Sequence, residues 1–346
     1  MIYFNSDYLE GAHPSIMVRL AETNMVQTVG YGEDEYCEAA REKIKTACQA
    51  PEADVHFLVG GTQTNTTVIA AILRPWQGVI SAVSGHINCH EAGAIESTGH
   101  KVITLPTTNG KITAQQVQDY VEWHRNDEST EHIVQPGMVY ISHPTEGGTL
   151  YTKAELTALY DTCRRYGLPL FIDGARLGYG LMAEESDMTL PEIARLCDVF
   201  YIGGTKVGAL FGEAVVIMNE ALKKDFRFIM KQRGGRMAKG RLLGVQFDAL
   251  FTDDLYFKIS RHAIEMAHQI RDIFVSAGYP LLFDSPTNQQ YPIMPDNKLA
   301  ILGKNFGYEY WERVDETHSG VRFCASWATK QEHVDALRAA VNALKK

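Results

Sequence analysis

The sequence predicts an α/β protein with a largely parallel central sheet, followed by a smaller α+β domain. Short apolar strands alternate with amphipathic helices through the first two thirds of the chain. The length of 346 residues suits about two domains. After about residue 245 the alternation gives way to a long helix, paired strands and a final helix. We therefore place the domains at residues 1–245 and 246–346.

The first domain is predicted from six apolar strands and the helices between them. Three helices begin with a capping box, in which a threonine precedes Gln or Glu by three residues: Thr113/Gln116, Thr152/Glu155 and Thr189/Glu192. The helix after Thr152 ends at Gly167. Strand–helix–strand units with short connections produce parallel strands covered by helices on both faces. The strands are expected at residues 55–59, 78–83, 101–105, 138–141, 168–172 and 198–202.

The second domain is predicted from a different order of elements. A helix is expected over residues 255–277, and a proline-rich turn region follows at 285–295. Residues 307–314 and 320–325 suit two paired strands. We expect Thr329 and Glu332 to cap a last helix, which places one apolar face on Val334, Leu337, Val341 and Leu344.

Composition excludes several classes of protein. The 33 Lys and Arg residues against 42 Asp and Glu give a net charge of −9, so no nucleic-acid partner is expected. The longest apolar run, residues 68–73, is far shorter than the ~20 residues of a membrane helix. The N-terminus lacks the features of a secretory signal, and the six cysteines form no CxxC pair. We expect a cytoplasmic protein with free thiols that acts on a small molecule.

Two charged residues follow buried strands of the predicted sheet. Asp173 ends the strand at 168–172, and Lys206 follows the strand at 198–202 after a Gly-Gly-Thr turn. Ligands of open α/β sheets bind at this carboxyl edge of the strands. A buried carboxylate is costly without a partner, and a desolvated lysine is a candidate for a Schiff base. The alternatives are a local Asp173–Arg176 ion pair and a solvated Lys206.

A cofactor connects these residues. Neither GxxxxGK[ST] nor GxGxxG is present, so the two common nucleotide fingerprints are missing. Pyridoxal 5′-phosphate (PLP) needs a lysine for its aldehyde and an acid for its pyridinium nitrogen. The segment Gly60-Gly61-Thr62-Gln63 between a strand and a helix could bind its phosphate through free backbone N–H groups. The sequence therefore predicts a PLP site.

Two further features leave alternatives open. His86 and His90 would share one face of a helix, but a metal site lacks a third ligand, and we predict no bound metal. Two other interpretations of this segment remain: a polar turn whose hydrogen bonds are satisfied, and an imidazole stacked on a pyridine ring. Arg322 lies in an apolar strand, where it could bind a substrate carboxylate or form an internal salt bridge.

Short motifs over nearly the whole chain resemble the low-specificity L-threonine aldolases, of the β-eliminating lyase group of PLP enzymes. Each motif is short, but the ordered set is specific. The resemblance implies the PLP-dependent transferase-like fold (fold type I) for the large domain. The motifs are residues 5–7 (NSD), 31–34 (YGED), 60–65 (GGTQTN), 85–93 (GHINCHEAG), 173–176 (DGAR), 203–206 (GGTK), 233–240 (RGGRMAKG) and 321–323 (VRF).

The resemblance implies roles for the cofactor site. Lys206 would carry PLP, Asp173 would hold the pyridinium and His86 would stack on the ring. The phosphate would be bound by Gly61, Thr62 and Gln63. The family's phosphate-binding arginine does not align cleanly, which leaves Arg236 and Lys239 as replacements.

The resemblance also implies the substrate site. Ser6, Arg176 and Arg322 would hold the substrate carboxylate. Tyr31 would reach into the site of a neighbouring subunit, in a homodimer or homotetramer with shared active sites. The expected reaction is cleavage of the Cα–Cβ bond of a β-hydroxy-α-amino acid into glycine and an aldehyde. β-Elimination or transamination on the same scaffold is the alternative, followed by a non-catalytic sensor or partner subunit.

The chain departs from the family at Glu146. A glutamate stands where the family has a histidine that contacts the β-hydroxyl group of the substrate. We expect Glu146 to contact the substrate, as the base that takes the hydroxyl proton or as a selector of substrates that carry a donor or positive charge. Alternatively, Glu146 accepts backbone N–H bonds in the following Gly-Gly turn, and His86 or a water is the base.

Overall fold

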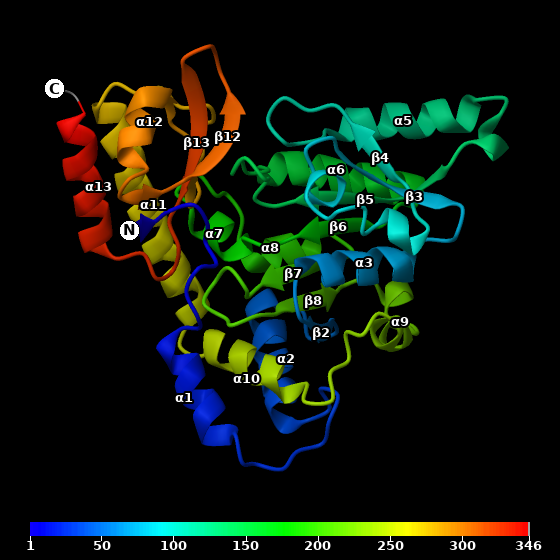
Figure 1. The fold of residues 1–346 in the computed structure, drawn as a ribbon. Helices are drawn as coiled ribbons and strands as arrows, with labels where there is room; N and C mark the ends of the chain where they lie inside the picture. The colour runs from blue at the N-terminus through cyan, green and yellow to red at the C-terminus, as the bar shows by residue number, and fades with distance from the viewer. Residues whose placement is uncertain (345–346) are drawn as a thin grey trace.

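A seven-stranded sheet organises the larger part of the molecule (Figure 1). The computed structural model describes residues 1–344. The strand order is β2-β8-β7-β6-β5-β3-β4, with the five strands from β7 to β4 parallel and β8 antiparallel to both of its neighbours. The strands are β2 (Asp54–Leu58), β3 (Gln77–Ala82), β4 (Val102–Leu105), β5 (Gln135–Ser142), β6 (Leu170–Asp173), β7 (Val199–Gly203) and β8 (Glu213–Ile217).

The six expected strands are confirmed, with ends shifted by a few residues. Strand β8 was not predicted. Its five buried residues, Glu213–Ile217, follow β7 after a glycine-rich turn and lie between β7 and β2. An antiparallel return needs no crossover helix, so the strand–helix alternation gives no signal for it.

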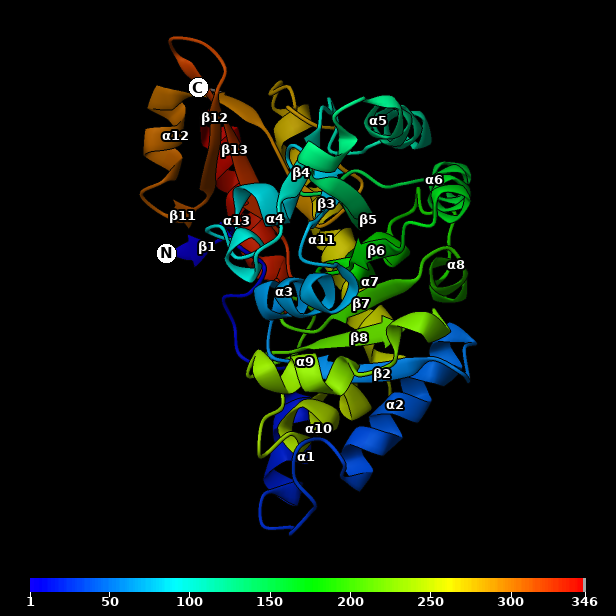
Figure 2. The same cartoon turned by 90° about the vertical axis from the view of Figure 1, so that its right-hand side faces the viewer.

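Helices cover both faces of the sheet (Figure 2). Side chains alternate along β5, so that Tyr140 packs with helices α3 and α4 while Ile141 packs with α6 and α8. The same alternation holds in β6 and β7. The helices of this part are α1 (Pro14–Thr23), α2 (Glu35–Cys48), α3 (Gly61–Ile72), α4 (His86–Cys89), α5 (Ala114–Asn126), α6 (Lys153–Tyr166), α7 (Leu177–Met182), α8 (Leu190–Arg195), α9 (Phe226–Gln232) and α10 (Arg241–Leu250).

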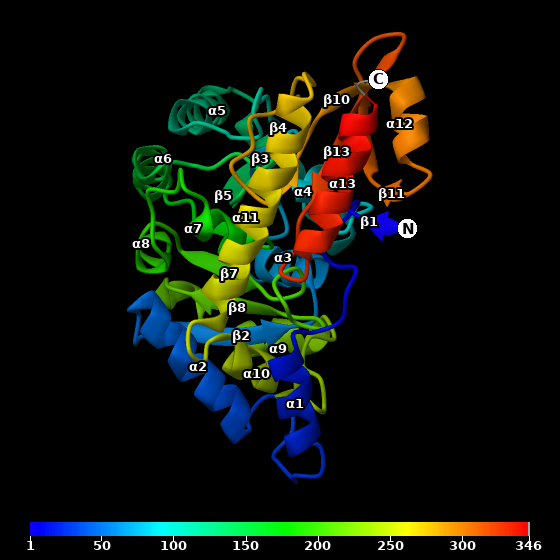
Figure 3. The same cartoon turned by 90° about the vertical axis from the view of Figure 1, so that its left-hand side faces the viewer.

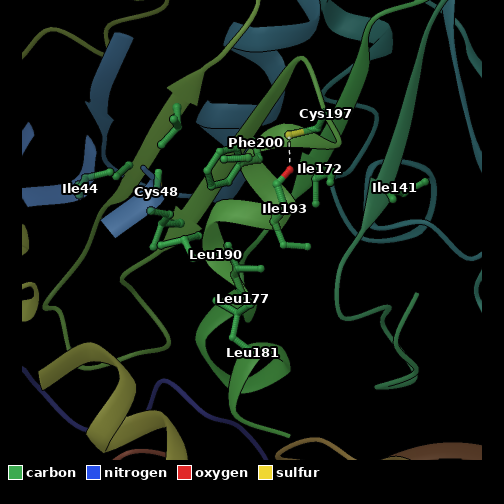
Figure 4. Close-up of a cluster of buried hydrophobic side chains, with 14 of the residues drawn as sticks. Ile44, Cys48, Ile141, Ile172, Leu177, Leu181, Leu190, Ile193, Cys197 and Phe200 are labelled. Atoms are coloured by element: carbon green, nitrogen blue, oxygen red, sulfur yellow. Dashed lines mark hydrogen bonds between the residues drawn. The ribbon is translucent and has the colours of Figure 1, made fainter. Parts of the chain in front are cut away.

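The core on the α8 side of the sheet is made of apolar side chains from several elements (Figure 4). Ile172 and Phe200 of the sheet pack with Leu190 and Ile193 of α8. Just after the end of α8, the Cys197 thiol donates to the Ile193 carbonyl at 3.2 Å. This packing holds β6 and β7 in place, and the candidate site lies where these two strands end.

Local signals at the helix ends are confirmed. The capping boxes of Thr113, Thr152 and Thr189 are present at the starts of α5, α6 and α8. Gly167 follows α6 with φ 72°, a left-handed conformation that glycine adopts without steric cost.

The C-terminal elements form a second core with the beginning of the chain. The N-terminal strand β1 (Ile2–Tyr3) pairs in parallel with β11 (Phe306–Gly307), and Phe4 packs into this core. Figure 3 shows helices α11 (Leu255–Ser276) and α13 (Gln331–Ala343) side by side. The other elements are β9 (Gln289–Gln290), β10 (Ile293–Pro295), α12 (Asp296–Leu302), β12 (Glu309–Arg313) and β13 (His318–Cys324).

The expected pairing of two strands near the C-terminus is confirmed by β12 and β13, which are antiparallel. The expected cap of the last helix is wrong. Helix α13 begins at Gln331 after Lys330, with no side-chain cap. The Thr329 hydroxyl instead accepts from the Ser326 amide at 2.8 Å, so it closes the preceding turn. The expected apolar face is present, with Val334, Leu337 and Val341 buried.

Within residues 1–344, no helix combines the length and the apolar character needed to cross a membrane.

Candidate active site

Asp173 lies at the end of β6, on the face of the sheet covered by α3. Its carboxylate accepts hydrogen bonds from the hydroxyls of Tyr140 at 2.6 Å and Tyr201 at 2.5 Å. The Asn65 side chain and the Ala175 amide donate at 3.1 and 3.0 Å. Burial opposes ionisation of Asp173, but these donors and the charge of His86 outweigh burial and hold its pKa below the usual value. A buried, ionised acid is therefore fixed at this edge.

His86 begins α4 beside this acid. Its Nδ1 lies 2.7 Å from the Glu91 carboxylate, whose side chain is fully buried. Asn65 donates from one amide nitrogen to both Glu91 and Asp173. Burial lowers the pKa of His86, but the hydrogen bond to Glu91 and the charges of Asp173 and Glu91 raise it above its usual value. The imidazole is thus oriented by Glu91, and its protonated form is favoured next to Asp173.

Lys206 lies in the turn after β7, the strand next to β6. It is half-buried, and within residues 1–344 its amine has no hydrogen bond or ion pair. The Tyr179 hydroxyl donates to its backbone carbonyl at 2.6 Å and fixes the turn. Burial and the charge of Arg176 lower the pKa of Lys206. An unpaired lysine with a lowered pKa is suited to attack an aldehyde.

A phosphate cradle is available at the start of α3. The helix begins at Gly61 after Gly60, with no side-chain cap, so its first N–H groups have no partner within the helix. A Cβ atom on Gly61 would lie 3.2 Å from the Tyr201 hydroxyl, which shows how closely the turn approaches the Asp173 site. The side chain of Thr62 is exposed. Gln63 accepts from the Val59 amide and donates to the Arg233 carbonyl, so it ties the helix to the segment around Gly234–Gly235.

The two basic candidates in that segment differ. Arg236 is half-buried, 3.6 Å from the Glu33 carboxylate, and lies over the ring of Tyr31 at 5.8 Å. Lys239 is exposed. Tyr31 is itself 45% exposed and has φ 61°, which is unusual for a tyrosine.

The NSD segment brings the expected carboxylate-binding residues together. Asp7 is fully buried and holds Arg176 through two bonds, from Nε at 2.6 Å and Nη2 at 3.0 Å. Burial opposes the ionisation of Asp7, but Arg176 and Lys206 lower its pKa to about 2. The Asn5 carbonyl accepts from Arg322 at 3.1 Å. Between these contacts, the buried hydroxyl of Ser6 has no partner in the described chain.

Glu146 lies near the end of β5 and contacts α4. Its Oε1 atom accepts from the His86 amide at 2.9 Å and from the Ser142 hydroxyl at 2.5 Å. The amide of Glu146 itself also lies close to this carboxylate. Burial raises the pKa of Glu146. The backbone carbonyl of Glu146, rather than its carboxylate, is held by the side chains of Gln289 and Tyr291.

In the described chain, neither a metal centre nor the surface pocket beside α5 is part of this site. Among the described residues, no group of three metal-ligating side chains could hold an ion. A surface pocket of about 630 Å³ is lined by the start of α5 and by α6, and it contains none of the residues above.

Several site residues were missed from the sequence. Tyr140 and Tyr201 were predicted only as apolar positions of strands. The alternation of side chains along β5 and β7 places both on the same face of the sheet as Asp173. The other missed residues come from distant segments: Asn65, Glu91, Asp7 and Glu213. Their polar character in buried surroundings was the available signal, but no local pattern pairs them.

The fold and the site define a PLP-dependent enzyme of fold type I: the held acid, the unpaired lysine and the uncapped helix start suit PLP's ring, aldehyde and phosphate. A family model described as beta-eliminating lyase matches residues 4–341. The chain therefore belongs to the β-eliminating lyase family.

Individual relatives agree with this assignment. A threonine aldolase structure from Leishmania major is 42% identical, with a TM-score of 0.97 and complete coverage of both chains. The low specificity L-threonine aldolase of Pseudomonas aeruginosa is 29% identical over 96% of this chain and 95% of that protein. A histidinol-phosphate aminotransferase from Clostridium acetobutylicum shares the fold, with a TM-score of 0.75 at 12% identity over 100% of this chain and 99% of that chain.

Proposed function

We propose that this chain is a PLP-dependent lyase that cleaves the Cα–Cβ bond of a β-hydroxy-α-amino acid, giving glycine and an aldehyde. The observation that carries the proposal is the convergence of Lys206, Asp173 and Glu146 at the carboxyl ends of three adjacent strands. The activity named for the Leishmania major and Pseudomonas aeruginosa relatives supports the same reaction.

The cofactor would be held by residues of the sheet edge and of α3. Lys206 would carry it, Asp173 would face the ring nitrogen and His86 would lie against the ring. The start of α3 at Gly61, Thr62 and Gln63 would bind the phosphate, together with Arg236 or Lys239. When bound, PLP supplies the electron sink that makes carbon–carbon cleavage possible.

The substrate carboxylate would be bound at the NSD segment. Asp7 grips Arg176 through Nε and Nη2, which leaves Nη1 outside the pair. The unpartnered Ser6 hydroxyl and the Nε of Arg322, buried without a partner in the described chain, supply further donors. Because Asp7 already holds the Arg176 fork in place, little side-chain entropy is lost when a carboxylate binds.

Glu146 would take the proton of the β-hydroxyl group. A glutamate with an ordinary pKa is a weak base at neutral pH, and burial raises the pKa of Glu146 toward a useful value. Oε1 is held by Ser142 and by the start of α4, so Oε2 is the oxygen available to the substrate.

Product analysis tests the reaction. We expect the PLP-loaded protein to release glycine and an aldehyde, in equal amounts, from threonine or another β-hydroxy-α-amino acid. Pyruvate or an oxo acid with ammonia would instead identify β-elimination, and an oxo acid with a new amino acid would identify transamination. Absence of glycine from a broad panel of β-hydroxy substrates contradicts the proposal.

The Glu146→Gln variant should lose most of its activity while it still binds PLP. Glutamine keeps an oxygen for the Ser142 hydroxyl and the His86 amide but cannot accept a proton. We expect kcat/KM for β-hydroxy substrates to fall by about 10²–10⁴-fold, the usual contribution of a general base. Glu155→Gln is the control, because Glu155 caps α6 and pairs with Lys111. Unchanged kinetics in a folded Glu146→Gln protein would show that Glu146 has only a structural role in the turn.

We further propose that the site is shared between subunits of a homo-oligomer. Tyr31 is exposed in a strained conformation and lies beside Arg236 and Lys231. The resemblance assigns this segment to a neighbouring subunit's site, and an exposed aromatic among cations suits such a contact.

Hybrid oligomers test the shared site. A Lys206→Ala chain and a Tyr31→Phe chain should each be impaired, and activity should recover when their subunits are exchanged, because some sites then contain both native residues. At most about one quarter of the native activity is expected in a dimer with random exchange. Failure to recover, with exchange confirmed by mass spectrometry, shows that Tyr31 acts within its own chain.

We also propose that the protein works in the cytoplasm. All six cysteines are unpaired, and Cys89 is exposed while the other five are buried. Free thiols suit a reducing cytoplasm.

A further inference from the structure

A buried carboxylate with no role in the proposed reaction lies beneath the turn that carries Lys206. Glu213 is the first residue of β8 and is only 3% exposed. Its neighbours across the sheet are Gly203 of β7 and Leu58 of β2. Because β8 runs antiparallel, its first residue lies at the edge where β6 and β7 end. Glu213 therefore shares this edge with Asp173.

Glu213 is bonded to the turn itself. Its Oε2 accepts from the Gly204 amide at 3.0 Å, and its carboxylate also accepts from the Thr205 hydroxyl. The Thr205 hydroxyl in turn accepts from the Gly212 amide at 3.0 Å. The Gly212 carbonyl receives the amides of Gly204 and Thr205 at 3.0 and 3.1 Å. The two residues before Lys206 are thus tied to the start of β8.

The Glu213 carboxyl group is enclosed by a tightly packed turn. A Cβ atom on Gly204 would lie 2.7 Å from the Gly212 carbonyl oxygen and 2.9 Å from the Phe247 ring, so the turn is packed without free space. A carboxylate in such a place costs free energy, and an amide or an apolar side chain of similar size would avoid that cost. The presence of an ionisable group here calls for a reason.

The charges around Lys206 supply a reason for an acid at position 213. Arg176 opposes a charged amine, whereas Asp7, Asp173 and Glu213 favour it. His86 on α4 adds a further positive charge when its imidazole is protonated. Glu213 in turn faces Lys206 and Asp173, and the hydroxyls of Tyr201 and Tyr256 are its other titratable neighbours. Asp7 is already paired with Arg176, and Asp173 with its four donors.

We propose that Glu213 is a positioning residue for Lys206: its carboxyl group holds the turn that carries the lysine, and its ionised form raises the pH at which the lysine amine loses its proton. The proposal rests on the proposed function only in taking Lys206 as the residue that carries PLP. Burial raises the pKa of Glu213 to about 8, so its carboxyl group is mostly neutral below that pH and mostly charged above it.

The test measures the lysine directly in the cofactor-free full chain. The rate at which acetic anhydride labels Lys206 is followed by mass spectrometry from pH 6 to 11, and its midpoint reports the pKa of the amine. Glu213→Gln keeps acceptors for the turn but removes the charge. We expect its midpoint to fall by about 1 pH unit, so that labelling below the midpoint becomes up to about tenfold faster.

Two further variants separate charge from structure. Glu213→Asp keeps the charge but is one methylene too short for the turn, so its midpoint should stay nearer the native value than that of Glu213→Gln. A purely structural role predicts the reverse order. Asp198→Asn is the matched control, because Asp198 is a buried carboxylate just before β7, at the opposite edge of the sheet, and it should leave the midpoint unchanged.

The outcomes decide between the proposals. An unchanged midpoint in folded Glu213→Gln overturns the inference. If that variant does not fold, Thr205→Ala removes the hydroxyl donor that stabilises the Glu213 charge; its midpoint should fall by a smaller amount, and an unchanged midpoint again overturns the inference. A failure of PLP to attach to Lys206 would overturn the proposed function but would leave the amine titration valid.

Discussion

Borohydride reduction of the PLP-loaded protein is expected to fix the cofactor on Lys206 and on no other lysine. Lys206 is half-buried and its amine is unpaired in the described chain, and burial with the nearby charge of Arg176 lowers the pKa of this amine. Surface lysines such as Lys153 are solvated instead, and the Lys153 amine pairs with the Glu192 carboxylate at 2.8 Å. Peptide mapping by mass spectrometry identifies the labelled residue.

Replacement of Lys206 should therefore abolish turnover. We expect Lys206→Ala to lose activity by several orders of magnitude, because the proposed link to PLP is lost. Lys153→Ala is the control and should retain native activity. A borohydride label on any other lysine of the native protein would refute the assignment.

Asp173→Asn should bind PLP but lose at least ~10²-fold in kcat, the scale seen when one preorganised electrostatic contact is removed. The carboxylate is held ionised by the charge of His86 and by donors from Tyr140, Tyr201 and Ala175. An anion beside the ring nitrogen favours its protonated form. Asparagine removes that charge, so the ring would withdraw electrons less strongly.

Two graded variants strengthen this test. Tyr140→Phe and Tyr201→Phe each remove one hydroxyl donor to Asp173 but leave its charge. We expect each to reduce kcat less than Asp173→Asn does, with PLP binding retained. Near-native kcat in a folded Asp173→Asn protein would show that the ring nitrogen does not depend on this acid.

The strands and caps were predictable because their causes are local. A run of apolar residues between turn signals predicts a buried strand, and a threonine three residues before Gln or Glu predicts a helix start. These rules located β2 to β7 and the starts of α5, α6 and α8. The same rule failed at Thr329, because a nearer amide, that of Ser326, took its hydroxyl.

The sequence by itself determined the class of protein and the two central residues of the candidate site. Asp173 and Lys206 each follow an apolar strand, and the geometry of parallel sheets brings such positions to one edge without any knowledge of the rest of the chain. The ordered motifs then pointed to a family that the comparison confirmed.

Only the tertiary structure decided which side chains hold those two residues in place. Asp7 meets Arg176 across 169 positions of sequence, Asn65 meets Asp173 across 108, and Glu213 reaches the Lys206 turn through an unpredicted antiparallel strand. Such contacts depend on strand order and register, which periodicity along a single segment does not specify. Their energy comes from satisfying buried polar groups, and the partner of a buried group is chosen by the whole fold.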